Sequence, residues 1–458
     1  MLELGLTAFI AIFLAMGMRR PFLWVLAYLY VDIVSPQKLA YGPLASIQLS
    51  LIVFVLAVVG WLFFDNKRDV RISMRQVLMV VLLIYCGMTT QSADFPAAAA
   101  EKWSWVWKAL IFAIFLPFTL RTHLRLEAAA LVMVLAAGSI AISGALKTLA
   151  GGGGYGTLHF FINDNTGLFE GSTLSCVAIA IIPLILWLSK YGTIFPADKR
   201  TRLFGLALVF SCLLIPIGTE ARTGLLCAAL LGVMMLRSVK NRGTYLAVIL
   251  VGGVIAAPLL PSTFSARMGT IQNNQSDESA SVRIAVWKWT LGYAADNPMG
   301  GGFDSYRGNR LRIQTANAET AGNTTSVMIT ETEDSGRAFH SAYFEMLGEQ
   351  GWPGLILWLT LQISGIIQLE SVQRRLRKSK APSDIRDAAL AHALQQGHFV
   401  YMLGAAFVGI AYQPFVYMLI GLQIGLVQLV RKRLAAQATK PVRTLVVPNQ
   451  PSAPLGAA

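Results

Sequence analysis

The sequence predicts an all-α polytopic membrane protein. Of its 458 residues, 55% are hydrophobic and only 14% are charged, and the mean hydropathy is +0.57. A water-soluble globule of this size needs more charged residues to cover its surface. Long apolar runs recur along the chain with short basic or polar turns between them, which is the pattern of membrane-crossing helices. The composition therefore excludes a soluble domain.

The apolar runs predict about 12–13 transmembrane helices. Several runs are shorter than the roughly 20 residues that cross a bilayer upright. One long polar stretch, 261–339, interrupts the series. The runs lie at residues 3–17, 21–35, 44–64, 76–90, 104–120, 125–147, 168–188, 203–218, 223–236, 244–260, 341–366, 392–411 and 414–430.

Basic residues occur at alternate turns of this series. The formal net charge is +14, and 26 of the 38 lysines and arginines lie in these turns. The positive-inside rule places such turns in the cytoplasm, which leaves the long polar stretch outside. The charge therefore reports topology and not nucleic-acid binding. The basic turns are at residues 19–20, 67–75, 121–125, 190–202, 237–242, 374–386 and 431–443.

These features divide the chain into four parts. We expect an N-terminal transmembrane bundle at 1–260, an extracytoplasmic loop at 261–339, C-terminal transmembrane helices at 340–436 and a disordered cytoplasmic tail at 437–458. The four cysteines lie in apolar runs without Cys-x-x-Cys spacing. They are expected to be small buried side chains and not disulfides or metal ligands.

The polar loop contains one amphipathic segment, 281–294. Its apolar residues recur at spacings of three and four, which predicts a helix that lies along the membrane surface above the bundle. Asp296-Asn297-Pro298 ends this helix, and Gly300–Phe303 predicts a tight turn. The residues that define its apolar face are Ile284, Trp287 and Leu291.

The later part of the loop, 315–335, is rich in threonine, asparagine, glutamate and alanine. This composition predicts a flexible outer excursion. Its acidic residues favour a solvated run, with a cation site as the alternative. Those residues are Glu331, Glu333 and Asp334.

A tryptophan-rich segment, Trp103–Trp107, has Lys102 and Lys108 beside it. We expect it to be an extracytoplasmic turn that anchors the chain at the membrane interface, because tryptophan and lysine are typical of that layer. An aromatic platform for a sugar is the alternative.

The hairpin Phe204–Leu236 contains an arginine close to its turn. The hairpin is short for two membrane crossings, so Arg222 is expected at or below the outer interface. An arginine at that depth is costly and favours an anionic partner. A structural pair with Glu220, or a side chain that extends to the interface, is the alternative.

His340 stands where the polar loop meets the next apolar run. In a helix that begins there, Phe344, Leu347 and Gly351 share its face, whereas Glu349 lies about 180° away. Glu349 is therefore not expected to orient the imidazole. A titratable group at this border indicates a functional site, and a helix cap at the interface is the alternative.

The block from Arg337 to Leu355 resembles the signature of the O-antigen ligase and O-antigen polymerase superfamily. In that family His-Asn or His-Ser begins a helix, and Glu-x-Gly-x-x-Gly-Leu follows. The segment Glu220–Gly224, the spacing of Arg283 and Trp287, and the turn 297–303 match further pieces in the same order. The resemblance covers most of the chain.

Residues Arg19–Arg20, Pro21 and Ser35–Pro36 further resemble the branch of O-glycosylation ligases associated with the exosortase system.

The resemblance implies a metal-independent membrane glycosyltransferase without a cofactor. Its donor would be a glycan on undecaprenyl pyrophosphate at the outer face of the bacterial inner membrane, and its acceptor an unidentified hydroxyl. Arginine can stabilise a pyrophosphate leaving group without a metal, and an imidazole with a pKa of about 6.5 can act as a general base.

We therefore expect inversion at the anomeric carbon, with His340 as the base and Arg222 and Arg283 on the pyrophosphate. For Arg283, an anchor to lipid headgroups is the alternative. Arg337, Tyr306 and Arg307 are further candidates for contact with donor or acceptor.

Two other functions remain open. A polymerase of the same superfamily would use a second lipid-linked glycan as its acceptor. A transporter of lipid-linked glycan is disfavoured because the halves show no inverted repeat and the helices show no clear mid-helix acidic residues of the kind that couple ion gradients. A scaffold without chemistry would not require Arg222 near the membrane turn.

Overall fold

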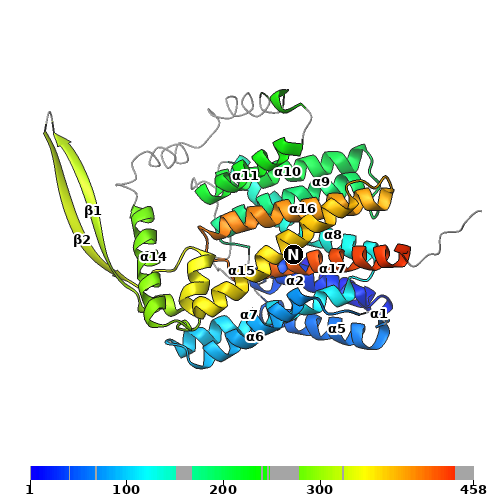
Figure 1. Cartoon of the computed structure of the whole chain (residues 1–458), viewed down its shortest axis with the longest axis horizontal. Coiled ribbons are helices and arrows are strands. Elements are labelled where there is room, and N and C mark those ends of the chain that lie inside the picture. Colours follow the sequence, from blue (N-terminus) through cyan, green and yellow to red (C-terminus); the bar gives the residue numbers. More distant parts are fainter. Residues whose placement is uncertain are drawn as a thin grey trace, which may run out of the picture.

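The computed structural model describes residues 2–438 except 41, 68–69, 151–167, 239–240, 245–246, 248–277 and 322–323. Within these ranges the chain is a bundle of helices with one two-stranded hairpin at one end (Figure 1). The elements are α1 (Leu2–Arg19), α2 (Phe22–Val34), α3 (Pro36–Leu39), α4 (Pro43–Ser46), α5 (Leu49–Phe64), α6 (Met74–Gln91), α7 (Pro96–Thr119), α8 (His123–Leu149), α9 (Gly171–Tyr191), α10 (Lys199–Gly218), α11 (Arg222–Ser238), α14 (Glu278–Asp296), η4 (Ser305–Gly308), β1 (Arg310–Ala321), β2 (Thr324–Ser335), α15 (Ala342–Leu376), α16 (Pro382–Ala405) and α17 (Pro414–Ala438).

The fold class predicted from the sequence is confirmed: the protein is an all-α polytopic membrane protein. Helices occupy twelve of the thirteen predicted positions, and the remaining one, 244–260, lies outside the described residues except for residues 244 and 247. In the described part of the chain, 6 helices are long and apolar enough to cross a membrane, and α2 and α5 are shorter apolar helices. The tail after residue 438 also lies outside the described residues.

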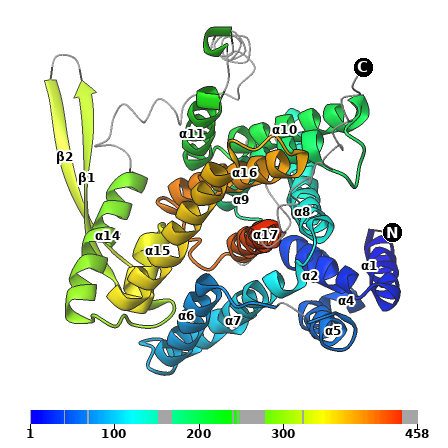
Figure 2. The same cartoon turned by 45° about the vertical axis from the view of Figure 1, so that its right-hand side comes forward.

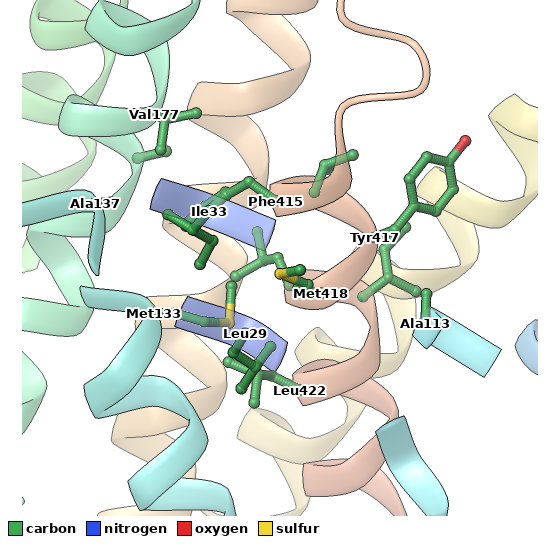
Figure 3. Packing of buried hydrophobic residues seen from close by; sticks show 14 of the residues in the cluster. Leu29, Ile33, Ala113, Met133, Ala137, Val177, Phe415, Tyr417, Met418 and Leu422 are labelled. Atoms are coloured by element: carbon green, nitrogen blue, oxygen red, sulfur yellow. The ribbon is translucent and has the colours of Figure 1, made fainter. Parts of the chain in front are cut away.

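Helix α17 forms the centre of the bundle. It contacts α2, α7, α8, α15 and α16, and these helices surround it in Figure 2. Almost every residue from Pro414 to Val427 is buried, because apolar side chains cover all faces of this segment. Figure 3 shows Phe415, Met418 and Leu422 packed among side chains from the neighbouring helices. All four cysteines are buried and free, as expected.

Two helices differ from their predicted limits at functionally important places. Helix α7 begins at Pro96, so Trp103–Trp107 is helical and not a turn. Proline at a first helical position explains the early start, because its missing N–H costs nothing there. Helix α16 begins at Pro382 for the same reason, about ten residues before the predicted start. The first turn of α7 is rich in alanine and that of α16 contains charged residues, so neither start belongs to a strongly apolar run.

The outer excursion predicted at 315–335 is instead part of a β-hairpin. Strands β1 and β2 pair antiparallel, with Ala321 opposite Thr324. Threonine, valine and isoleucine alternate through β2, and such β-branched residues favour strands. A Gly-Asn pair between two such runs is a hairpin signal that composition alone does not reveal. The hairpin and α14 lie together at one end of the bundle (Figure 1).

Helix α14 is present where the sequence predicts it, and two valines join Trp287 in its contact with the rest of the protein. Val282 and Val286 are buried against Leu311 and Phe339. Of the predicted apolar face, Trp287 stacks on Phe344, whereas Ile284 and Leu291 are 50% and 47% exposed. The packed residues recur every four positions, and their small or β-branched side chains allow close approach to the segment before α15.

The glycine turn after α14 is bound to the first part of α15. Gly300 and Gly302 have φ of 81° and 77°, and Gly351 interrupts α15 with φ 63°. The Gly301 and Gly302 amides donate to the carbonyls of Gly348 and Glu349 at 3.0 and 2.9 Å. A Cβ on Gly351 would lie 2.1 Å from the Pro298 carbonyl oxygen. Only glycine fits this backbone contact.

Replacing Gly351 with alanine should therefore loosen the turn from α15. The positive φ and the backbone clash together should cost more than about 1 kcal/mol in the free energy of unfolding. Gly292, whose Cβ would meet nothing within 4 Å, provides the matched control. Thermal unfolding of both alanine variants tests this; equal stabilities would contradict it.

Candidate active site

A cavity of about 370 Å³ lies where α7, α9, α14, α15 and the turn around η4 meet. Its wall combines basic, acidic and aromatic side chains from segments far apart in the sequence. The charged and titratable lining residues are Glu101, Lys102, Glu170, Arg283, Asp304, Tyr306, Arg307, His340, Glu345, Glu349 and Tyr412.

Four of the six predicted site residues line this cavity: His340, Arg283, Tyr306 and Arg307. They come from α14, from η4 and from the segment that precedes α15. The remaining two, Arg222 and Arg337, are not among the described lining residues.

His340 lies before the helix and not at its first turn. Its φ is 49°, in the left-handed region, and α15 begins at Ala342. The helical-wheel argument for its face was therefore wrong. Left-handed non-glycine residues are uncommon, and they concentrate at functional sites. Asp304, with φ 58°, is a second such residue in the same wall.

Helix α14 fixes the backbone on both sides of His340. The Trp287 indole Nε1 donates to the carbonyl of Phe339 at 2.9 Å. The Trp287 ring stacks on Phe344, with centroids 5.0 Å apart and an interplanar angle of 5°. The same helix carries Arg283 one turn before Trp287. The loop helix thus positions the imidazole and supplies a guanidinium to the same cavity.

The surroundings of His340 favour the neutral imidazole. Although the residue is open to the cavity, partial desolvation lowers its pKa from 6.5, and the positive charges of Arg283 and Arg337 lower it further. Glu170 opposes this by raising the pKa. The imidazole can therefore accept a proton at neutral pH.

Arg307 and Tyr306 belong to the short helix η4. Arg307 Nη2 lies 3.5 Å from Asp304 Oδ2, and its side chain is 48% exposed. Tyr306 meets Phe339 edge-on, with centroids 5.7 Å apart. Burial raises the pKa of the Tyr306 phenol, followed by the effect of Asp304, so it stays a protonated donor.

Arg222 begins α11, and the turn before α11 contacts the start of α9. The Thr219 and Ser175 hydroxyls are 2.8 Å apart, and Gly224 packs against Ser175. These contacts join the turn before α11 to the first residues of α9. Glu170 caps α9 by accepting from the Ser172 and Thr173 amides, and all three residues line the cavity. Arg222 therefore lies one element away from the space that His340 faces.

Arg337 points to the hairpin. It forms an ion pair with Asp334, and its backbone is clamped to Asn309 by hydrogen bonds of 3.0 and 2.7 Å. Its side chain is 52% exposed. It acts on His340 through its charge.

Lys102, which was expected only beside an interface anchor, lies at the centre of a charged cluster in the cavity wall. Its Nζ lies 2.7 Å from both Glu345 Oε1 and Glu349 Oε1, and 3.7 Å from Asp304 Oδ1. The rings of Tyr412 and Phe303 lie 5.1 and 5.7 Å from the same nitrogen. We call Lys102, Asp304, Glu345 and Glu349 the Lys102 cluster.

The Lys102 cluster connects α7, the turn before η4 and α15. Glu349 Oε1 also accepts from the Asp304 amide at 3.0 Å, and Glu345 Oε2 accepts from the Ala411 amide at 3.0 Å. Glu349 thus bonds to Lys102 and to the turn. Glu345 and Glu349 are four residues apart, so one helical face presents both to the lysine. That spacing was the available sequence signal.

Two parts of the chain match families of known proteins. Residues 1–193 match a family of unknown function (DUF5935), and residues 206–359 match the family described as O-Antigen ligase. A search of curated proteins gives no match. The second match spans all six predicted site residues, from Arg222 to His340. It supports the O-antigen ligase superfamily and a glycosyltransferase-type activity for this multi-pass membrane protein.

Proposed function

We propose that the protein transfers a glycan from undecaprenyl pyrophosphate to an acceptor hydroxyl at the periplasmic face of the inner membrane. The observation that carries this proposal is the cavity in which His340 and Arg283 meet, within the segment similar to O-antigen ligases. A neutral imidazole and a guanidinium in one wall are the groups that such a displacement requires.

The reaction is a single displacement at the anomeric carbon. The acceptor oxygen forms the new glycosidic bond while its proton passes to the His340 imidazole. The bond from the anomeric carbon to the phosphate oxygen breaks, and the electron pair leaves with undecaprenyl pyrophosphate. Arg283 stabilises the charge that develops on that leaving group, because a guanidinium binds phosphate oxygens with paired donors and does not titrate.

Arg307 and Arg222 extend the anion-binding wall in this proposal. Arg307 lines the cavity beside Arg283, whereas Arg222 stands behind the start of α9. A long lipid pyrophosphate can contact both the cavity and the neighbouring membrane turn. Tyr306 supplies a hydroxyl donor to the sugar, and Arg337 tunes His340 from the hairpin side.

The product identifies the acceptor class. Purified protein in proteoliposomes would be given lipid-linked glycan with and without a hydroxyl-bearing lipid or protein acceptor, and the products analysed by mass spectrometry. Glycan on the added acceptor supports a ligase, and longer glycan on the lipid carrier without an acceptor supports the polymerase. Movement of unaltered lipid-linked glycan across the bilayer, without transfer, would contradict both.

The pH dependence of transfer should follow His340. The base must be neutral, so the rate should fall as pH decreases through its pKa, which lies below 6.5. Arg283→Gln removes a charge that lowers this pKa, so the acid limb should move to higher pH. Glu170→Gln removes the opposing charge and should move the limb to lower pH.

The control for these shifts is Arg312→Gln, because Arg312 is 78% exposed on β1 and pairs with Glu333 outside the cavity. Rate–pH profiles at saturating donor measure the shifts. An acid limb that stays in place in both cavity variants would show that His340 is not the titrating base.

A further inference from the structure

Three buried polar side chains form a string in the helical core. Arg75 on α6, Gln423 on α17 and His398 on α16 are each 0% exposed. Arg75 Nη2 donates to Gln423 Oε1 at 2.8 Å, and Gln423 Nε2 lies 2.9 Å from His398 Nδ1. None of these residues lines the candidate active site. We call them the Arg75 string.

The hydrogen bonds decide which atoms of the string can still donate. Because Gln423 Oε1 accepts from Arg75, its amide nitrogen donates to His398 Nδ1. A neutral imidazole that accepts at Nδ1 carries its hydrogen on Nε2. Burial beside a guanidinium favours that neutral form. In the described part of the chain, His398 Nε2 and Arg75 Nε and Nη1 have no hydrogen-bond partner. All the unbonded polar atoms of the string are therefore N–H donors.

Arg75 also forms no ion pair with a carboxylate among the residues that the structure describes. The Arg75 side chain is 0% exposed, so bulk water does not solvate the guanidinium. A buried charge without a partner costs several kcal/mol. The glycine at position 365 on α15 leaves the space that this guanidinium occupies, because a Cβ on Gly365 would lie 2.4 Å from Arg75 Nη2.

We propose that Arg75 binds a small monovalent anion of the size and charge of chloride within the bundle. One guanidinium charge balances one negative charge, and the free N–H groups on Nε and Nη1 supply donors in the fork that suits an anion. Gln362 lies three residues before Gly365 on α15 and is also 0% exposed, and neither of its amide atoms has a hydrogen-bond partner among the residues that the structure describes. The site is independent of the proposed glycan transfer.

The test compares chloride with gluconate at constant ionic strength, using the full-length protein in nanodiscs. The Tm should rise by about 1–2 °C for each tenfold increase in chloride above its dissociation constant. Arg75→Met should abolish this dependence. Gln423→Glu places a carboxylate beside the guanidinium, so it should raise the Tm in gluconate and remove the response to chloride. Arg374→Met, at a 77% exposed side chain paired with Glu370, is the control.

Bromide provides a second readout that does not depend on a variant. Anomalous difference density from bromide beside Arg75 in the wild-type protein would support the site. Water alone at that position would overturn it. A wild-type Tm that ignores the anion, or a chloride response that persists in Gln423→Glu, would also overturn the proposal.

Discussion

Replacing His340 with asparagine should lower the rate of glycan transfer by about 10²- to 10⁴-fold, the usual contribution of a general base. Asparagine tolerates the left-handed backbone that His340 adopts at φ 49°, whereas alanine is strained there. The asparagine variant therefore removes the base and preserves the fold. Its KM for the lipid-linked donor should change little, because Arg283 and Arg307 still line the cavity.

His392→Asn is the matched control for this experiment. His392 bonds to Gln373 on α15 and does not line the cavity, so its loss should leave the rate near that of the wild type. A His340→Asn protein that transfers glycan at the unmutated rate would show that the imidazole has no chemical role.

Replacing Lys102 with methionine should destabilise the protein by about 3–5 kcal/mol, the typical cost of removing one partner from a buried ion pair. Glu349 and Glu345 are 0% and 9% exposed, so bulk water solvates these carboxylates poorly once the ammonium is gone. The turn that carries Tyr306 and Arg307 should separate from α15, and transfer should fall with it. Lys102→Arg, which keeps the charge, should retain more of the stability and more of the transfer rate than Lys102→Met.

A second substitution separates this charge effect from a simple loss of packing. Glu349→Gln removes one of the two close carboxylates, so Lys102→Met with Glu349→Gln should be more stable than Lys102→Met alone. Lys190→Met, at an exposed lysine on α9, should change the unfolding free energy by less than about 0.5 kcal/mol. Thermal unfolding in detergent measures the stabilities of Lys102→Met, Glu349→Gln, the double variant and Lys190→Met. Additive losses in the double variant would contradict the role assigned to the Lys102 cluster.

The helices were predictable because a long apolar run in the sequence is enough to indicate a membrane-crossing helix. The run from Phe415 to Val430 is apolar on every face, and α17 is buried on every face at the centre of the bundle. The starts of α7 and α16 were missed because alanines or charged residues occupy their first turns. The hairpin was missed because composition hides the alternation of β-branched residues in β2.

Residues of the candidate site were predictable only where a local sequence pattern distinguishes them. His340 and Arg283 were predicted from the border of the polar loop and from family motifs, Tyr306 and Arg307 were further candidates for contact with donor or acceptor, and the fold brings these four to one cavity. Lys102 was not found, because its partners lie more than two hundred residues away on α15. A single sequence shows which residues share a helical face, but not which helix that face meets.

The most direct test of glycan transfer by single displacement is the anomeric configuration of the product. Purified protein in proteoliposomes would receive lipid-linked glycan of known configuration and a hydroxyl acceptor, and NMR would determine the new linkage. Inverted configuration, with one undecaprenyl pyrophosphate released for each glycan transferred, is the expected result. A retained configuration, or no transfer to any hydroxyl or lipid-linked acceptor, would contradict it.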